Sequence, residues 1–316
     1  MQILRLVIER ILLSLLTLLI VSLIIFFMLE ILPGDVATRI LGRDATPESL
    51  AALRAKLQLD APALLRYLAW LGHLATGHFG HSLVSDRPII AILGPRIFNT
   101  VLLSVYAFII YIPLTAIPAM IQAVRRDRAI DHGLSVLTLV LLSMPDFLLG
   151  TVLLIVFVVL LPLLPAISLV DATSGSGEYL RAMTLPAVTL AIVMAVYAVR
   201  MLRDNLIEVL DSDYVRMAEL KGLSPRRVLL RHALPNALVP TLNVTALNLA
   251  YLVGGVVVVE KIFGYPGFGS LLVDALQLRD LPLIEATIMI AAAVYIVANL
   301  LADIGAILLN PRLRQG

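Results

Sequence analysis

The sequence has no cysteine, which excludes disulfides, thiolate metal sites and iron–sulfur clusters. It is also poor in charge: 15% of its 316 residues are charged, against about 25% in an average soluble domain. Hydrophobic residues make up 60% of the chain, and the mean hydropathy is +0.99. This composition is typical of an integral membrane protein. The net charge of +2 is too small to indicate nucleic acid as a partner.

Lysine is scarce too, and this excludes one enzymatic activity. The phosphate-binding loop of ATPases requires Gly-Lys followed by Ser or Thr. The three lysines, at positions 56, 221 and 261, follow Ala55, Leu220 and Glu260, so the sequence has no such loop. We therefore expect that this chain does not hydrolyse ATP itself.

The sequence does have six long apolar runs. Five are uncharged (11–29, 97–124, 182–199, 232–259 and 286–302), and the sixth, 132–170, is interrupted only by Asp146. Since a membrane-spanning helix needs about 20 mostly apolar residues, the sequence predicts an all-α membrane protein with six transmembrane helices. The first run follows Arg5 and Arg10 as in a secretory signal, but no small-x-small cleavage site precedes Glu30, so we expect an uncleaved helix.

Basic residues predict the orientation of these helices. With the N-terminus in the cytoplasm, the inside segments 1–10, 125–131, 200–238 and 309–316 contain 14 of the 24 Lys and Arg residues. The two shorter outside loops contain only Arg181, Lys261 and Arg279. The positive-inside rule therefore predicts that both termini are cytoplasmic and that 33–98 is a long extracytoplasmic loop region.

One inside segment, 213–237, has the pattern of two short helices joined by a tight turn, which we call the elbow. Gly222 is the residue type that ends a helix in the left-handed conformation, and Ser224-Pro225 is a strong signal for a helix start. A rigid elbow on a membrane domain indicates a docking partner. The alternative is a solvated juxtamembrane loop whose basic residues meet anionic lipid.

Short motifs along nearly the whole chain resemble one family. They are Pro33-Gly34-Asp35, Leu57-Gln58-Leu59-Asp60, Ser143-Met144-Pro145, Leu185-Pro186-Ala187, Glu260-Lys261-Ile262-Phe263, Pro266-Gly267-Phe268-Gly269, Arg279-Asp280 and Asn310-Pro311-Arg312. In this order and spacing they are similar to ABC transporter permease subunits of the dipeptide/oligopeptide/nickel permease family. The long first outer loop resembles the first-type permease of the heterodimeric pair.

The resemblance implies the ABC type I importer permease fold and a multi-pass position in a bacterial or archaeal cytoplasmic (inner) membrane. The implied partners are a second homologous permease subunit, two ABC ATPase subunits, an extracytoplasmic substrate-binding protein and membrane lipid. ATP and Mg would bind to the partner ATPase subunits, and this chain would bind no cofactor. The implied solute is a peptide, with nickel complexes, glutathione or a sugar as alternatives.

The resemblance also assigns the elbow to ATPase coupling. The residues expected to take part are Ala218, Glu219, Lys221, Gly222, Leu223 and Arg226. Ala218 would permit close approach of the ATPase, and the charged residues would contact it. Met217 and Leu220 are bulkier than the residues usual in the family, so we expect docking with altered packing. Gly77-His78-Phe79-Gly80 also departs from the usual Gly-Asp-Leu-Gly.

Other residues are candidates for the translocation pathway or its gate. Asp146 is an ionisable residue within a span, which indicates a function by default; alternatively, it caps backbone N–H groups at the break after Pro145. Glu260 and Phe263 close the fifth span at the outer face, as part of a gate or as an interface anchor.

Three clustered histidines, His73, His78 and His81, lie in the outer loop region. Imidazole suits nickel, copper and zinc, but spacing alone is weak evidence, so polar loop residues are the expected interpretation and no metal site is predicted.

Two other functions compete with an importer subunit. A secondary transporter working alone tends to place acidic or His relays in several spans, whereas this chain has only Asp146 there. A membrane enzyme would need a constellation of catalytic residues in the spans, and the sequence has none. We expect three consecutive regions: 1–32 with the first span, the loop region 33–98, and 99–316 as a five-helix core with the coupling loop at 203–238.

Overall fold

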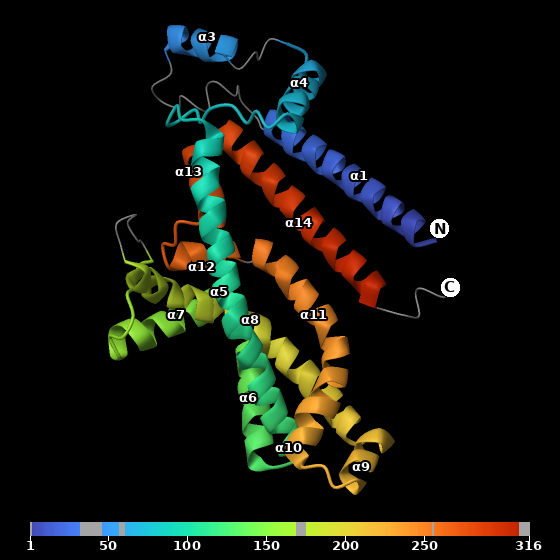
Figure 1. Cartoon of the computed structure of the whole chain (residues 1–316). Coiled ribbons are helices and arrows are strands. Elements are labelled where there is room, and N and C mark those ends of the chain that lie inside the picture. Colours follow the sequence, from blue (N-terminus) through green and yellow to red (C-terminus); the bar gives the residue numbers. More distant parts are fainter. Residues whose placement is uncertain (1, 32–45, 57–60, 169–174, 255, 310–316) are drawn as a thin grey trace. The chain divides into compact units, whose positions relative to one another are not determined.

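The computed structural model describes residues 2–31, 46–56, 61–168, 175–254 and 256–309 (Figure 1). Every regular element in these ranges is a helix, and an isolated bridge joins His81 to Pro88. The predicted all-α class is confirmed for this part of the chain. The chain forms two compact units, residues 1–98 with 267–316 and residues 99–266.

The first unit is built around the pairing of its first and last helices. Its elements are α1 (Gln2–Ile31), α3 (Pro47–Lys56), α4 (Ala63–Ala75), the start of α5 (Ile89–Val124), α13 (Phe268–Leu278) and α14 (Leu281–Leu309). α1 packs along α14, and α4 packs on α1. The hydroxyls of Ser22 and Tyr67 lie 2.8 Å apart, and the rings of Phe26 and Trp70 are 5.8 Å apart. Aromatic contacts thus hold α4 against the first apolar helix.

The second unit is centred on α8. Its elements are the rest of α5, α6 (Ala129–Leu142), α7 (Asp146–Leu154), η2 (Ile155–Leu160), α8 (Ser176–Leu210), α9 (Asp213–Leu220), α10 (Pro225–Val228), η3 (Leu229–Ala233), α11 (Leu234–Gly254) and α12 (Val256–Ile262). Helices α6, α7, α11 and α12 all pack against α8. The buried face of α8 includes Ala187, Ala191, Ala195 and Ala198. Small residues at this helical spacing let neighbouring backbones approach closely.

The apolar run 132–170 does not form one straight helix. α6 ends at Leu142, α7 begins at Asp146, and the two helices are bent by 110°. Pro145 accounts for the break because proline has no N–H and disfavours helical geometry at the preceding residue, Met144. Asp146 lies directly after this break, in the first turn of α7.

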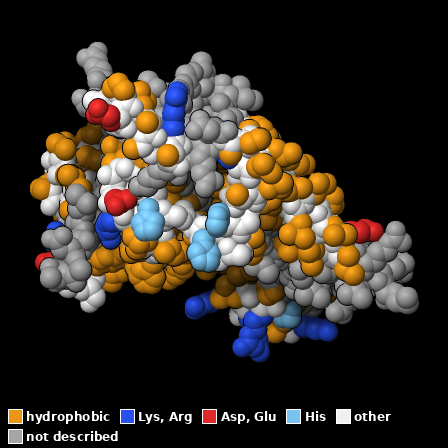
Figure 2. Space-filling model, turned by 90° about the horizontal axis from the view of Figure 1, so that it is seen from above, with side chains coloured by type: hydrophobic (Ala, Val, Ile, Leu, Met, Phe, Trp, Pro, Cys, Tyr) orange, Lys and Arg blue, Asp and Glu red, His pale blue; other side chains and the backbone are white. Residues whose placement is uncertain are grey.

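Several helices are suited to a membrane. Among the described residues, Ile8–Met28, Ile89–Val124, Ser176–Leu210 and Leu281–Leu300 are long and apolar enough to cross one, and the bent pair α6–α7 gives a fifth candidate. The described residues of the run 232–259 are helical, in η3, α11 and α12, but they are not among these candidates. Six spans therefore stay a prediction. Large apolar side chains are exposed, such as Leu12, Ile109 and Val136, and hydrophobic atoms cover much of the face in Figure 2.

The compact units differ from a simple succession of regions along the chain. Residue 98 is a boundary in both divisions, but the unit that contains the first 98 residues also contains α13 and α14. The three consecutive regions 1–32, 33–98 and 99–316 stay a prediction about the assembled protein in its membrane.

Candidate functional site: the elbow and the polar residues around it

The segment 213–237 folds as an elbow at the end of α8 (Figure 1). α9 ends at Leu220, and Gly222 follows with a φ of +79°. The Gly222 N–H donates to the Glu219 carbonyl at 2.8 Å, and the Leu223 N–H donates to the Ala218 carbonyl at 3.3 Å. These two bonds are the Schellman ending of a helix, in which glycine takes the left-handed position without a steric cost. The predicted break at Gly222 is confirmed.

The second arm of the elbow starts where the sequence indicates. Ser224 is the N-cap residue of α10, and Pro225 is its first helical residue. The Ser224 carbonyl accepts the N–H groups of Arg227 and Val228 at 2.9 and 3.0 Å. The Ser224 side chain makes no capping hydrogen bond. Proline therefore contributes more than the serine hydroxyl, because its fixed φ suits the start of a helix.

A small apolar cluster holds the two arms together and against the end of α8. Its buried members are Val215, Ala218 and Val228, with Val209, Leu210 and Leu223 packed against them. Leu223 contributes through the same hydrophobic contact that accompanies a Schellman ending. The elbow is thus a packed extension of α8.

Hydrogen bonds attach the other side of α9 to the start of α11. The Tyr214 hydroxyl donates to the His232 carbonyl at 3.3 Å and lies 3.0 Å from the Asn236 side-chain nitrogen, which donates to it. Asn236 also donates to the His232 carbonyl at 2.8 Å. A displacement of the elbow would therefore act on both α8 and α11.

The predicted coupling residues fall into two groups. Ala218 is 7% exposed and lies within the apolar cluster, as does the half-buried Leu223. The other four, Glu219, Lys221, Gly222 and Arg226, are exposed. Met217 and Leu220 are 56% and 77% exposed. The small size of Ala218 thus serves packing within the chain, and the two bulky residues are the most exposed of the large apolar side chains on the elbow.

Basic side chains surround the second arm of the elbow. Arg226, Arg227 and Arg231 line an open hollow of about 290 Å³ together with Ser224 and Leu230. The elbow therefore combines exposed apolar side chains on α9 with positive charge on α10 and η3.

Asp146 does not cap the helix that it begins. The N-cap of α7 is Pro145, and no side chain makes a capping hydrogen bond there. The half-buried Asp146 carboxylate instead accepts a hydrogen bond from the Tyr251 hydroxyl. The interpretation of Asp146 as a cap is therefore wrong, and its carboxylate links α7 to α11.

Tyr251 belongs to a row of polar residues along one face of α11. The Thr245 hydroxyl lies 3.0 Å from the Tyr111 hydroxyl, and the Asn248 side-chain nitrogen donates to the Met194 carbonyl at 3.1 Å. Positions 245, 248 and 251 recur at helical spacing, so they share one face. In the membrane, such side chains hold neighbouring helices together by hydrogen bonds.

Glu260 and Phe263 are buried. Glu260 is 0% exposed, and its carboxylate accepts the Thr100 hydroxyl at 2.5 Å; Phe263 is 1% exposed. Burial raises the pKa of the nearby Tyr265 hydroxyl, which stays protonated and donates to the Asn99 carbonyl at 2.8 Å. These contacts hold both residues inside the second unit, and the gate and interface-anchor roles both stay predictions.

Of the three clustered histidines, His78 makes a polar side-chain contact. His78 Nδ1 lies 3.0 Å from the Thr76 hydroxyl. In the residues that the structure describes, no group of three or more His, Cys, Asp or Glu side chains is arranged to hold a metal ion.

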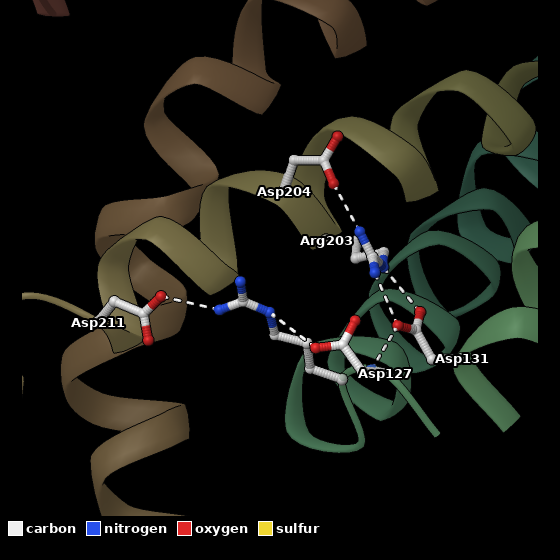
Figure 3. A network of polar contacts seen from close by, with 6 residues as sticks. Asp127, Asp131, Arg203, Asp204 and Asp211 are labelled. Atoms are coloured by element: carbon white, nitrogen blue, oxygen red, sulfur yellow. Dashed lines mark hydrogen bonds and ion pairs between the residues drawn. The ribbon is translucent and has the colours of Figure 1, made fainter. Parts of the chain in front are cut away.

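Sequence reasoning missed a buried ion pair near the elbow (Figure 3). Asp131 in the first turn of α6 is 0% exposed and is paired with Arg203 of α8. The available signal was a lone acidic residue at the start of an apolar run, beside several arginines. A buried charge needs a partner, so this position predicted an ion pair, but nothing in the sequence identified Arg203 as the partner.

Comparison with known proteins gives matches over nearly the whole chain. Residues 112–315 match the family described as "Binding-protein-dependent transport system inner membrane component", and residues 3–104 match the N-terminal family of these membrane components. A putative peptide transport system permease protein of Brucella abortus (strain 2308) is 36% identical over 309 residues, 98% of each chain.

Two further relatives have names that state a solute. A probable peptide ABC transporter permease protein of Sinorhizobium fredii (strain NBRC 101917 / NGR234) is 34% identical over 294 residues, which are 93% of this chain and 94% of the relative. A glutathione transport system permease protein of Salmonella choleraesuis (strain SC-B67) is 34% identical over 308 residues, 98% of each chain.

Proposed function

The chain belongs to the family of inner membrane components of binding-protein-dependent transport systems, and we propose that it is the first-type permease subunit of an ABC importer for peptides. The observation that carries this proposal is the elbow, an ordered and exposed extension of α8 within the family match. Relatives named as peptide permeases, similar over almost their full length, support the solute class.

The elbow is the proposed docking surface for an ATPase subunit. Met217 and Leu220 would enter an apolar depression on that subunit, and Glu219, Lys221 and Arg226 would form charged contacts at its edge. Exposed apolar side chains at the centre of a polar surface are typical of a protein interface. Ala218, Gly222 and Leu223 would act by keeping the elbow rigid, as their packing and backbone bonds support.

The proposed topology has six spans and both termini in the cytoplasm. The described helices account for four candidate spans and a bent fifth, and the run 232–259 would supply the remaining one. The basic residues of the elbow and of the turn at 125–128 support a cytoplasmic position for both. The loop region 33–98 would then face the binding protein.

The proposed complex contains a second homologous permease, two ABC ATPases and an extracytoplasmic binding protein. The family description supports a binding protein, and the absence of a phosphate-binding loop in this sequence supports separate ATPases. ATP and Mg would bind only on those subunits. The solute pathway would lie between the two permeases.

Alternating access would follow from the geometry of the elbow. ATP would draw the two ATPases together, and the docked elbows would move with them. Because the elbow is packed on α8 and bonded to α11, these helices would turn and open the pathway outward. Hydrolysis would reverse the motion. ATP shifts this equilibrium only by its different affinity for the two states.

Glutathione is a second candidate solute, because one of the similar permeases carries that name. It is itself a small peptide, so both solutes present an ammonium and carboxylates. Asp146 is the proposed contact for the ammonium group, since its half-buried carboxylate is an ionisable group in the apolar run.

Co-purification tests the docking role. The tagged chain, expressed together with the second permease and the two ATPases, should retain the ATPases. Leu220→Asp should lose them while inserting normally, because it places a charge in the proposed apolar contact. His78→Asp, an exposed change in the outer loop region, is the control and should retain them. Retention of the ATPases by a double variant that carries Leu220→Asp and Met217→Asp would contradict the proposed role of the elbow as the docking surface.

A further inference from the structure

The turn between α5 and α6 is attached to α8 by a set of charged side chains (Figure 3). Asp131 accepts the Nε and Nη2 groups of Arg203 at 2.8 and 2.7 Å, in a two-pronged geometry. The Asp127 N–H donates to the same carboxylate at 3.0 Å. A carboxylate held by three N–H groups has one orientation, and the planar guanidinium is fixed with it.

This pair does something that the surrounding packing cannot. The buried face of α8 combines alanines with larger apolar residues, such as Leu202 and Leu206 on either side of Arg203, and the hydrophobic effect that buries them is not directional. A two-pronged ion pair is directional and resists both sliding and rotation. Buried ion pairs are often replaceable by apolar residues without loss of stability, so stability alone is a weak explanation for this one.

The position of the pair connects two functional parts of the second unit. Arg203 lies eight residues before Asp211, the C-cap residue of α8. This separation corresponds to about 12 Å along the helix axis. Asp211 accepts Arg126 Nη1 at 2.9 Å, so the turn at 125–128 contacts α8 a second time. α8 leads directly into the elbow, and α6 leads into the bend before Asp146.

We infer that Asp131 and Arg203 are positioning residues that make α6 follow α8 when the elbow moves. The pair would thereby transmit the motion of the ATPase to the bent pair α6–α7. This inference rests on the proposed function. It adds a specific link, through Arg203 of α8, between the elbow and the bent pair α6–α7.

The test measures the ratio of peptide uptake to ATP hydrolysis in vesicles that contain the complete complex and binding protein. Asp131→Asn keeps the size of the side chain but weakens the pair, and it should lower the ratio about fivefold or more, at the low end of usual coupling effects. Arg203→Lys keeps the charge but loses the planar fork, so the ratio should fall by a smaller factor. A purely structural role would lower both rates together and leave the ratio unchanged.

A double variant and a control make the result decisive. Asp131→Leu with Arg203→Met replaces the pair by apolar side chains; it should assemble but remain uncoupled. Asp204→Asn removes only the exposed partner of Arg203, which lies 2.8 Å away, and should keep the wild-type ratio. A wild-type ratio in the double variant, or failure of every pair variant to assemble, would overturn the inference. Lack of ATP-driven uptake by the wild-type complex would instead contradict the proposed function.

Discussion

At the scale of single residues, Asp146 gives the sharpest prediction about the solute. Its carboxylate is half-buried and hydrogen-bonded by Tyr251. Asp146→Asn keeps an acceptor for that hydroxyl but removes the charge. We expect it to lower uptake of cationic peptides about tenfold relative to neutral ones, which corresponds to about 1.4 kcal/mol. Competition uptake in vesicles, with equal amounts of assembled complex, measures this difference.

Tyr251→Phe is the matched variant for Asp146→Asn, because it removes the hydrogen bond and keeps the charge. The loss of one hydrogen bond should cost about 0.5–1.5 kcal/mol of stability. Discrimination between cationic and neutral peptides should stay as in the wild type. If both variants discriminate normally, Asp146 holds α7 against α11 and does not meet the solute.

Predictions for single residues succeeded where local backbone conformation determines the residue type. They failed where contacts between distant parts of the chain determine burial or a partner. Gly222 was identified correctly, because a left-handed helix ending favours glycine in any protein. Ala218 was expected at the surface but is buried, since its neighbours in the cluster include Val209 and Leu210 of α8 and Val228 of α10. The partner of Asp131 lies 72 positions away along the chain, a separation that no local pattern reveals.

At the scale of elements, the prediction concerns the ending of α9. Gly222→Val introduces a β-branched residue at a φ of +79°, with an expected cost of about 1–2 kcal/mol. The strain should displace α10 relative to α9 and so disturb docking. We expect normal insertion, weaker retention of the ATPases and a lower uptake-to-hydrolysis ratio, measured on the purified complex.

Gly222→Asn separates backbone strain from the mere presence of a side chain. Asparagine tolerates the left-handed conformation, and a Cβ at this position would meet no atom within 4 Å. This variant should behave nearly as the wild type. Equal behaviour of Val and Asn, whether both normal or both defective, would show that the conformation of Gly222 does not control coupling.

The bent pair shows why element boundaries were harder to predict than element type. Hydrophobicity over 132–170 predicts a helix in the membrane but contains no information about its direction. Pro145 indicated a break, yet a proline also occurs inside α8, at Pro186, where the helix continues. Neighbouring helices decide between these outcomes, because they can satisfy the backbone groups that a proline leaves free.

At the scale of the whole molecule, the topology has a direct test because the chain has no native cysteine. Leu220→Cys on the elbow and His78→Cys in the outer loop region are both exposed positions. In intact cells, a membrane-impermeant maleimide should label the second and not the first. Inside-out vesicles should give the reverse. Labelling of both from one side would contradict the predicted orientation.

The fold class of the whole molecule was predictable from the sequence, but its division into two compact units was not. Low charge and long apolar runs predicted an all-helical membrane protein, because the membrane excludes most other folds. The union of α13 and α14 with the first 98 residues was not predictable, since it depends on contacts between the two ends of the chain. The same holds for the pairing of α1 with α14.

The most direct test of the central claim is ATP-driven peptide uptake by reconstituted vesicles. The chain is incorporated with its second permease and two ATPases, with binding protein and labelled peptide on the outside. ATP on the ATPase side should produce uptake, and omission of this chain, of the ATPases or of the binding protein should abolish it. Uptake without the ATPases, or ATP hydrolysis by the purified chain alone, would contradict the account.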